Sequence, residues 1–260
     1  MPLATDQTDT ASESQFSKVP QVTLIFWVIK ILCTTLGETG GDAVTMSMNL
    51  GYLIGTAIFA AIFFLAVAVQ IYAKRFHPFI YWITIIATTT VGTTMADLAD
   101  RDLGIGYTGG SLTLFVLLMA SLGVWYWSEG SISVNTVSTP KVEMFYWVTI
   151  MFSQTLGTAL GDWTADSAEL GYGWAAVIFG SLLAVVAVLH FWTKISKTAL
   201  FWAAFILTRP LGAVVGDFLD KPLEHGGLNL SRYTASGALV VLVIACILIF
   251  PQQPGKHPER

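Results

Sequence analysis

Four long stretches without any charged residue constrain the fold of this chain more than any other feature of its sequence. Each is longer than the roughly 20 residues that a helix needs to cross a bilayer. The chain has 260 residues, of which 54% are hydrophobic and only 12% charged, whereas a soluble domain carries about a quarter charged residues. The sequence therefore predicts an all-α polytopic membrane protein. The charge-free stretches are Gly51–Ala73, Leu103–Ser128, Leu170–Thr193 and Tyr233–Gly255.

Four further apolar runs alternate with these stretches and share one pattern. An aromatic residue and a tryptophan are followed, after nine residues, by glycine, after three more by glycine or alanine, and then at once by aspartate. Trp27, Trp82, Trp147 and Trp202 are 55, 65 and 55 residues apart, so the two halves of the chain repeat with an offset of 120. We expect eight transmembrane helices in four two-helix repeats, with pseudo-two-fold symmetry that approaches four-fold. The runs are Val22–Asp42, Phe79–Asp97, Val142–Asp162 and Ala199–Asp217.

The repeats divide the chain into two halves with a tail at each end. Because each repeat has an even number of helices, all four enter the membrane in the same direction and are parallel repeats. Connecting segments on one side hold eight Lys and Arg residues and those on the other hold three, which places both termini in the cytoplasm. The expected segments are a disordered tail 1–19, a first half 20–129, a linker 130–140, a second half 141–250 and a tail 251–260.

Several classes of protein are unlikely for this composition. Cys33 and Cys246, the two cysteines, offer neither a disulfide framework nor a zinc motif. The chain has no basic cluster of the kind that binds nucleic acid and no motif of an intramembrane enzyme, and it indicates no resident cofactor. The expected partners are the lipid bilayer and a small cation or proton, and the sequence leaves the oligomeric state open.

The aspartate that ends each repeated pattern is the main candidate for function. Ionisable groups within a membrane normally face the bundle interior or a hydrated cavity, so we expect helices 1, 3, 5 and 7 at the centre and the others outside. Fifteen residues of helix, roughly 22 Å, separate Trp from Asp. With the tryptophans at the cytoplasmic interface, the aspartates lie at one level towards the outer side. The predicted ion-binding and metal residues are Asp42, Asp97, Asp162 and Asp217, joined by Glu38 for ion binding.

Other polar residues lie on the same helix faces or just beyond them. Arg209 is expected to pair with Glu38, which matches it in depth, whereas Lys30 is expected to reach the cytoplasmic interface. The supporting residues are Arg209, Thr34, Thr89, Gln154, Asp100, Asp166 and Asp220. The paired small residues have the spacing that allows helices to pack closely; their glycines are Gly37, Gly41, Gly92, Gly157, Gly161, Gly212 and Gly216.

Four carboxylates at one level repel one another unless they are protonated or bridged by a cation. Their oxygen ligands suit hard ions such as Mn²⁺, Ca²⁺ or Mg²⁺. We therefore expect an inner-membrane transporter that exchanges a divalent metal for protons, with the separate halves providing alternating access. A passive cation channel and a non-transporting scaffold or sensor are the alternatives, and each aspartate could instead simply cap a broken helix.

The repeated motif also carries a family resemblance. Four tandem two-helix repeats, each with an aromatic–Trp pair and a small–small–Asp ending, resemble a family of bacterial membrane proteins defined by a repeat of unknown function. Its members are usually called uncharacterised membrane-anchored proteins. The resemblance covers residues 20–250 and implies a multi-pass protein of the bacterial inner membrane, but it implies no activity.

Overall fold

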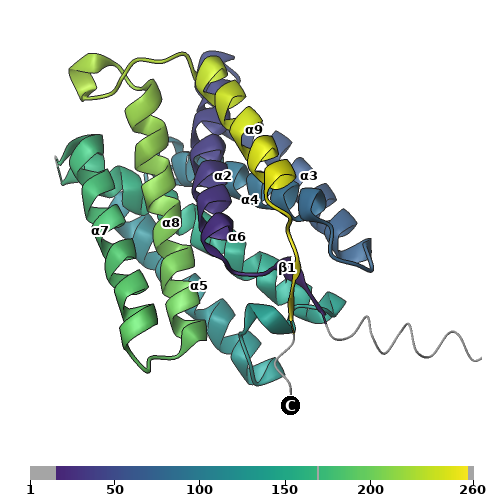
Figure 1. Cartoon of the computed structure of the whole chain (residues 1–260). Helices are drawn as coiled ribbons and strands as arrows, with labels where there is room; N and C mark the ends of the chain where they lie inside the picture. Colours follow the sequence, from purple (N-terminus) through teal and green to yellow (C-terminus); the bar gives the residue numbers. More distant parts are fainter. Residues whose placement is uncertain (1–15, 169, 257–260) are drawn as a thin grey trace, which may run out of the picture.

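In a computed structural model, eight long helices account for most of the described residues, 16–168 and 170–256 (Figure 1). All eight were expected, and most of their ends agree with the predicted ends to within a few residues. The eighth ends earlier than its charge-free stretch, since Pro251 follows soon after it. The helices are α2 (Leu24–Asp42), α3 (Gly51–Tyr72), α4 (Pro78–Asp97), α5 (Tyr107–Glu129), α6 (Pro140–Asp162), α7 (Gly171–Trp192), α8 (Lys197–Asp220) and α9 (Arg232–Ile249).

Seven of these helices are long and apolar enough to cross a membrane, and α6 is as long but more polar. The polar residues of α6 include Thr149, Ser153 and Gln154, which are all fully buried inside the bundle. Their burial explains how a helix of lower hydropathy fits among apolar ones, since its polar side chains do not face lipid.

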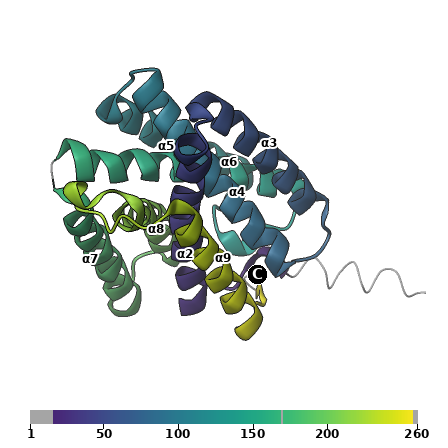
Figure 2. The same cartoon turned by 90° about the horizontal axis from the view of Figure 1, so that it is seen from above.

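Helices α2, α4, α6 and α8 form a closed ring in which each packs against two others of the four. The remaining helices lie outside this ring: α3 packs on α4, α5 on α6, α7 on α8 and α9 on α2 (Figure 2). The first helix of every repeat is therefore central and the second peripheral, as the distribution of ionisable residues predicted.

The outer helix of each repeat packs on the inner helix of the next repeat, and α9 closes the circle on α2. The two helices of one repeat are thus not packed on each other as a hairpin. This arrangement corrects the expectation of two separate halves: α5 from the first half is packed on α6 from the second, and α9 from the second is packed on α2 from the first. The halves are interlocked.

Glycines allow the inner helices to approach so closely. The first small residue of each repeat lies against the side chain seven positions after the tryptophan of the next repeat, and a Cβ atom there would overlap or press on it. The expected role of these residues in helix packing is confirmed. The contacts are Gly37 on Thr89, Gly92 on Gln154, Gly157 on Arg209 and Gly212 on Thr34, and one turn later Gly41 on Thr93, Gly161 on Ala213 and Gly216 on Glu38.

The aromatic–Trp pairs fill the interior of the bundle towards the end where the chain termini lie. Trp82, Trp147 and Trp202 are buried, and the hydroxyl groups of Tyr81 and Tyr146 form a hydrogen bond of 2.6 Å. Because they pack inside the bundle, these three tryptophans do not form a belt of rings that faces lipid. Successive aromatic rings contact one another at centroid distances of 5.0–6.3 Å, so their burial is stabilised by mutual packing.

The two expected tails are partly ordered. Strand β1 (Phe16–Pro20) pairs antiparallel with β2 (Pro254–Lys256), and Lys18 forms a buried ion pair of 2.6 Å with Glu143 of α6. This pairing could not be predicted for residues 1–19 and 251–260, because strands of five and three residues leave no periodic signal. The rest of these tails, 1–15 and 257–260, lies outside the described residues.

Replacing Gly37 by Val tests the packing of the ring. The added side chain overlaps Thr89, so we expect the free energy of unfolding to fall by about 1–3 kcal/mol and the melting midpoint by roughly 2–12 °C. Intrinsic tryptophan fluorescence of the purified protein in detergent measures the midpoint. Gly123→Val on α5, where nothing lies within 4 Å of a Cβ, is the control, and equal midpoints for the two variants would contradict the account.

Candidate ion-binding site

All four aspartates of the repeats are buried, with exposed fractions of 1–3%. In three repeats the helix continues beyond the aspartate as a π-helical turn: η1 (Ala43–Ser47), η2 (Leu98–Asp102) and η4 (Trp163–Ser167). In the fourth, α8 itself continues to Asp220. Because the chain stays helical and no cap hydrogen bond forms at Asp42, Asp97 or Asp162, the capping alternative is wrong for these three. Such π-turns are frequent at functional sites.

Two protein cations divide the four aspartates into pairs. The Nε atom of Arg101 lies 2.9 Å from Asp97 Oδ1, and its Nη2 lies 3.4 Å from Asp162 Oδ2. The Nζ atom of Lys221 lies 2.9 Å from Asp42 Oδ2 and 3.0 Å from Asp217 Oδ1. Arg101 and Lys221 are themselves 120 residues apart, so the two halves build the same bridge. The repulsion that suggested a bound cation is therefore relieved by side chains of the protein.

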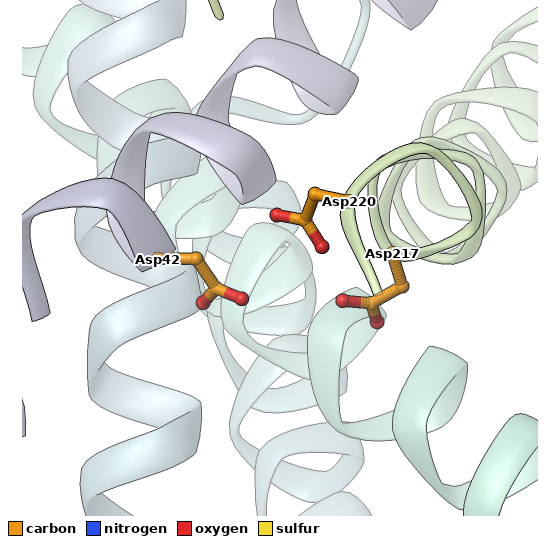
Figure 3. A group of neighbouring side chains, drawn as sticks. All are labelled: Asp42, Asp217 and Asp220. Carbon is orange, nitrogen blue, oxygen red and sulfur yellow. The ribbon is translucent and has the colours of Figure 1, made fainter. Parts of the chain in front are cut away.

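One pair of aspartates is extended by a third acid. Asp42, Asp217 and Asp220 each offer a carboxylate oxygen within 4.8 Å of the others, and their carboxylates face a common region between α2 and α8 (Figure 3). Asp97 and Asp162 do not belong to this group. Among the described residues, the structure thus brings together two of the four predicted metal ligands and adds Asp220, which was expected only as a supporting residue.

Two basic side chains, Lys221 and Arg232, contact the three carboxylates of this cluster. Arg232, at the start of α9, places its Nε 3.0 Å from Asp220 Oδ2 and 3.7 Å from Asp42 Oδ2. Lys221 contacts the carboxylates of Asp42 and Asp217. Burial lowers the pKa of Lys221, but the attraction of Asp217 and Asp42 outweighs burial and raises the pKa above its ordinary value. The charged ammonium form of Lys221 is therefore favoured beside these carboxylates.

A second network lies deeper, one turn before the aspartates. Arg209 is fully buried, and its Nη2 donates to Glu38 Oε2 at 2.9 Å, which confirms the predicted pair. The hydroxyls of Thr93 and Thr158 also lie within hydrogen-bond distance of this nitrogen and share its two N–H groups with Glu38. Since Glu38, Thr93 and Thr158 occupy the same position in the first three repeats, one guanidinium of α8 joins α2, α4 and α6. Arg209 therefore fills the middle of the ring.

The remaining residues of this level line the packed interior. Thr34 donates to the carbonyl oxygens of Ile31 (2.8 Å) and Thr208 (3.3 Å). Thr89 and Gln154 are fully buried. Lys30 is also fully buried rather than at the interface: its Nζ lies 4.2 Å from the ring centroid of Phe205 and 3.5 Å from Gln154 Oε1. The expectation for Lys30 is wrong because its side chain points into the ring of helices.

The other two predicted supporting acids lie away from the cluster. Asp166 is exposed and accepts a hydrogen bond of 3.2 Å from Tyr172. Asp100 is half-buried beside Gly110 of α5. Asp100 and Asp220 occupy equivalent sequence positions, yet only Asp220 joins an aspartate pair, because Arg232 holds it there.

Arg232 and the bridging roles of Arg101 and Lys221 were not predicted from the sequence. A signal for the bridges was present, since Asp97–Asp100–Arg101 recurs as Asp217–Asp220–Lys221. Arg232 has no such signal. The residue 120 positions before it is Leu112, so nothing in the repeat indicates a functional residue.

The fold and this site define a class: a multi-pass helical membrane protein of four repeats with a buried network of acids and bases. The chain belongs to the family described as Repeat of Unknown Function (DUF347), whose repeat it matches over residues 25–76, 80–131, 145–196 and 200–250. No curated protein matches the chain. No solved structure matches it either.

A double-mutant cycle tests the central ion pair. Arg209→Met leaves Glu38 as a buried charge without its partner, so we expect a loss of about 3–5 kcal/mol in the free energy of unfolding. Glu38→Gln in the same chain should restore much of it. Lys141→Met, which breaks the largely exposed pair of 2.8 Å with Glu129, is the control and should cost less than about 1 kcal/mol. Strictly additive effects of the Arg209 and Glu38 changes would contradict a direct pair.

Proposed function

We propose that this protein exchanges a small cation, most readily a divalent metal such as Mn²⁺, Ca²⁺ or Mg²⁺, for protons across the bacterial cytoplasmic membrane. In this proposal all eight helices cross the bilayer and both termini are cytoplasmic. The acidic cluster then faces the outer side, because α2 and α8 begin near the termini and carry Asp42, Asp217 and Asp220 at their far ends.

The observation that carries the proposal is the convergence of three buried carboxylates from two helices. Asp42, Asp217 and Asp220 approach one another to within 4.8 Å, and they outnumber Lys221 and Arg232 by one charge. Carboxylate oxygens are the ligands that hard divalent ions prefer. An excess negative charge in a site removed from water attracts a cation or a proton strongly.

Lys221 gives this cluster a way to exchange its occupant. Its ammonium bridges Asp42 and Asp217 at 2.9 and 3.0 Å, where a metal ion would also bind. A lysine is a flexible point charge, whereas the guanidinium at the equivalent position, Arg101, is a rigid fork. Withdrawal of Lys221 would free two carboxylates for a metal, and its return would expel the ion. Protons taken up by the same carboxylates would have the same effect.

The filled centre of the ring supports exchange over passive conduction. Arg209 links all four inner helices, and the aromatic layer fills the bundle on the other side of Lys30. A continuous open pore along the axis has no room there. Glu38, which packs on Gly216 between α2 and α8, is the next carboxylate inward and the proposed proton relay. Because the halves are interlocked, we expect local movement along the α2–α8 contact rather than rocking of one half.

Flux measurements in proteoliposomes test this proposal. Asp42→Asn and Asp217→Asn should each abolish metal-dependent proton flux, because each removes a shared charge of the cluster. Asp97→Asn, the equivalent of Asp217→Asn in the other half, should retain measurable flux, and the exposed Asp166→Asn should retain it fully. Wild-type flux in both cluster variants, with the fold intact, would rule out the proposed site.

Replacing Lys221 by Met tests the competition. Loss of the internal ammonium should strengthen metal binding by at least about tenfold, and titration calorimetry with Mn²⁺, Ca²⁺ and Mg²⁺ measures it. Arg101→Met provides the matched comparison, since it removes the equivalent bridge outside the three-acid cluster. Unchanged or weaker binding in Lys221→Met would show that the ammonium supports the site rather than competes for it.

A non-transporting scaffold is the second candidate. It is favoured by the fact that each of the four aspartates is already paired with Arg101 or Lys221. Under this alternative the charges only hold the ring together. It predicts no metal binding and no flux in a folded wild-type protein, together with similar losses of stability for Asp97→Asn and Asp217→Asn.

A further inference from the structure

A groove of about 830 Å³ opens between α2, α7 and α8, in the half of the bundle nearest the termini (lower half of Figure 1). Most of its lining is apolar and includes Ile31, Leu183, Phe201 and Ala204. Leu24, at its edge, is 82% exposed. The groove therefore faces the surroundings of the helices, which for this chain are lipid.

Basic and polar side chains belong to the lining of the groove, and two of them lie at the end where α7 stops and α8 starts. Lys197 at the start of α8, His190 at the end of α7 and Lys256 of β2 all line it, with Asn135 beside them. Lys197 also donates to the carbonyl oxygen of His190, which fixes these two elements together. Among the described residues, those that line the groove include no acid. A negatively charged group is thus favoured at this end, and the side-chain amide of Asn135 adds a donor.

The length of the groove matches one leaflet of a bilayer. Along α8 it runs from Lys197 to Thr208, eleven residues or roughly 16 Å of helix, which is about half of the roughly 30 Å hydrocarbon core. At its deep end, Thr34 donates to the carbonyl oxygen of Thr208 at 3.3 Å and Gly212 packs on Thr34. The contact between α2 and α8 is closed from that point on.

We propose that this groove is a binding site for one anionic phospholipid from the leaflet on the side of the chain termini. The phosphate lies among Lys197, Lys256 and His190, and an acyl chain follows α8 towards Thr208. An apolar lining cannot replace the hydration of an ion, so the groove does not fit a vestibule for the proposed cation. This inference stands on its own residues and holds whether or not the protein transports.

Lipid retention measured by native mass spectrometry tests the site. The full chain is released from mixed micelles that contain equal amounts of phosphatidylglycerol and phosphatidylcholine. Wild-type protein should retain one phosphatidylglycerol in preference to phosphatidylcholine. Lys197→Glu should weaken that preference about tenfold, because one attractive charge is replaced by a repulsive one. A Glu at the first position of α8 also suits the helix dipole, so the helix itself should remain stable.

Two further variants complete the test. Lys194→Glu changes a neighbouring exposed lysine that does not line the groove and should keep the wild-type preference. Ala187→Trp fills the groove and should abolish retention of both lipids. Equal retention of the two lipids by the wild type, or equal effects of Lys194→Glu and Lys197→Glu, would overturn the proposal. So would a dimer of the chain that covers the groove and excludes lipid.

Discussion

The close approach of four helices at their glycines governs the rest of this structure. A side chain next to such a crossing has no access to water, so a charge placed there must be neutralised by another side chain of the ring. Arg209 meets this demand by contacting the other three inner helices at once, and Arg101 and Lys221 meet it by bridging neighbouring aspartates. The glycines let the inner helices approach closely. The buried charges can be accommodated at these contacts because each is paired with a charge on a neighbouring helix. Packing and electrostatics therefore cannot be separated here, and a change in either is expected to disturb the other.

The two halves share one arrangement of helices but differ in the charged residues at equivalent positions. In each half, a cation that follows the inner helix of the second repeat contacts the aspartate of its own repeat and that of the next repeat. In the first half this cation is Arg101, whose rigid fork suits a permanent bridge. In the second it is Lys221, joined by Asp220 and Arg232. Both sites hold one acid more than they hold bases, and what distinguishes the α2–α8 contact, where the last repeat meets the first, is its third carboxylate. The apolar groove lies along the same two helices, α2 and α8, at the opposite end of the bundle. The ring is thus closed by a contact that differs chemically from its other three.

Much of this arrangement could be predicted from the repeat pattern. The eight helices, the central position of the first helix in each repeat, the packing role of the glycines and the Arg209–Glu38 pair all follow from spacing and helical periodicity. The pairing of α3 with α4, and of α9 with α2, could not be predicted, because an apolar outer helix carries no mark of which neighbour it covers. The inward orientation of the tryptophans could not be predicted either, since a lipid-facing belt and a packed interior both accept large rings. Lys30 was misplaced because its distance along α2 gives its depth, but not whether its side chain turns inward or outward. The choice of Asp220 over Asp100 depends on Arg232, which lies outside the repeat pattern.

The central claim is that Asp42, Asp217 and Asp220 form one cation site between the first and last inner helices. Anomalous X-ray scattering from crystals soaked in Mn²⁺ tests it most directly, because the signal locates the metal without reference to transport. The account predicts a single strong peak within coordination distance of these three carboxylates, with the Lys221 side chain displaced from Asp42. A structure in which Lys221 still bridges Asp42 and Asp217 at saturating Mn²⁺, with no peak beside them, would contradict it.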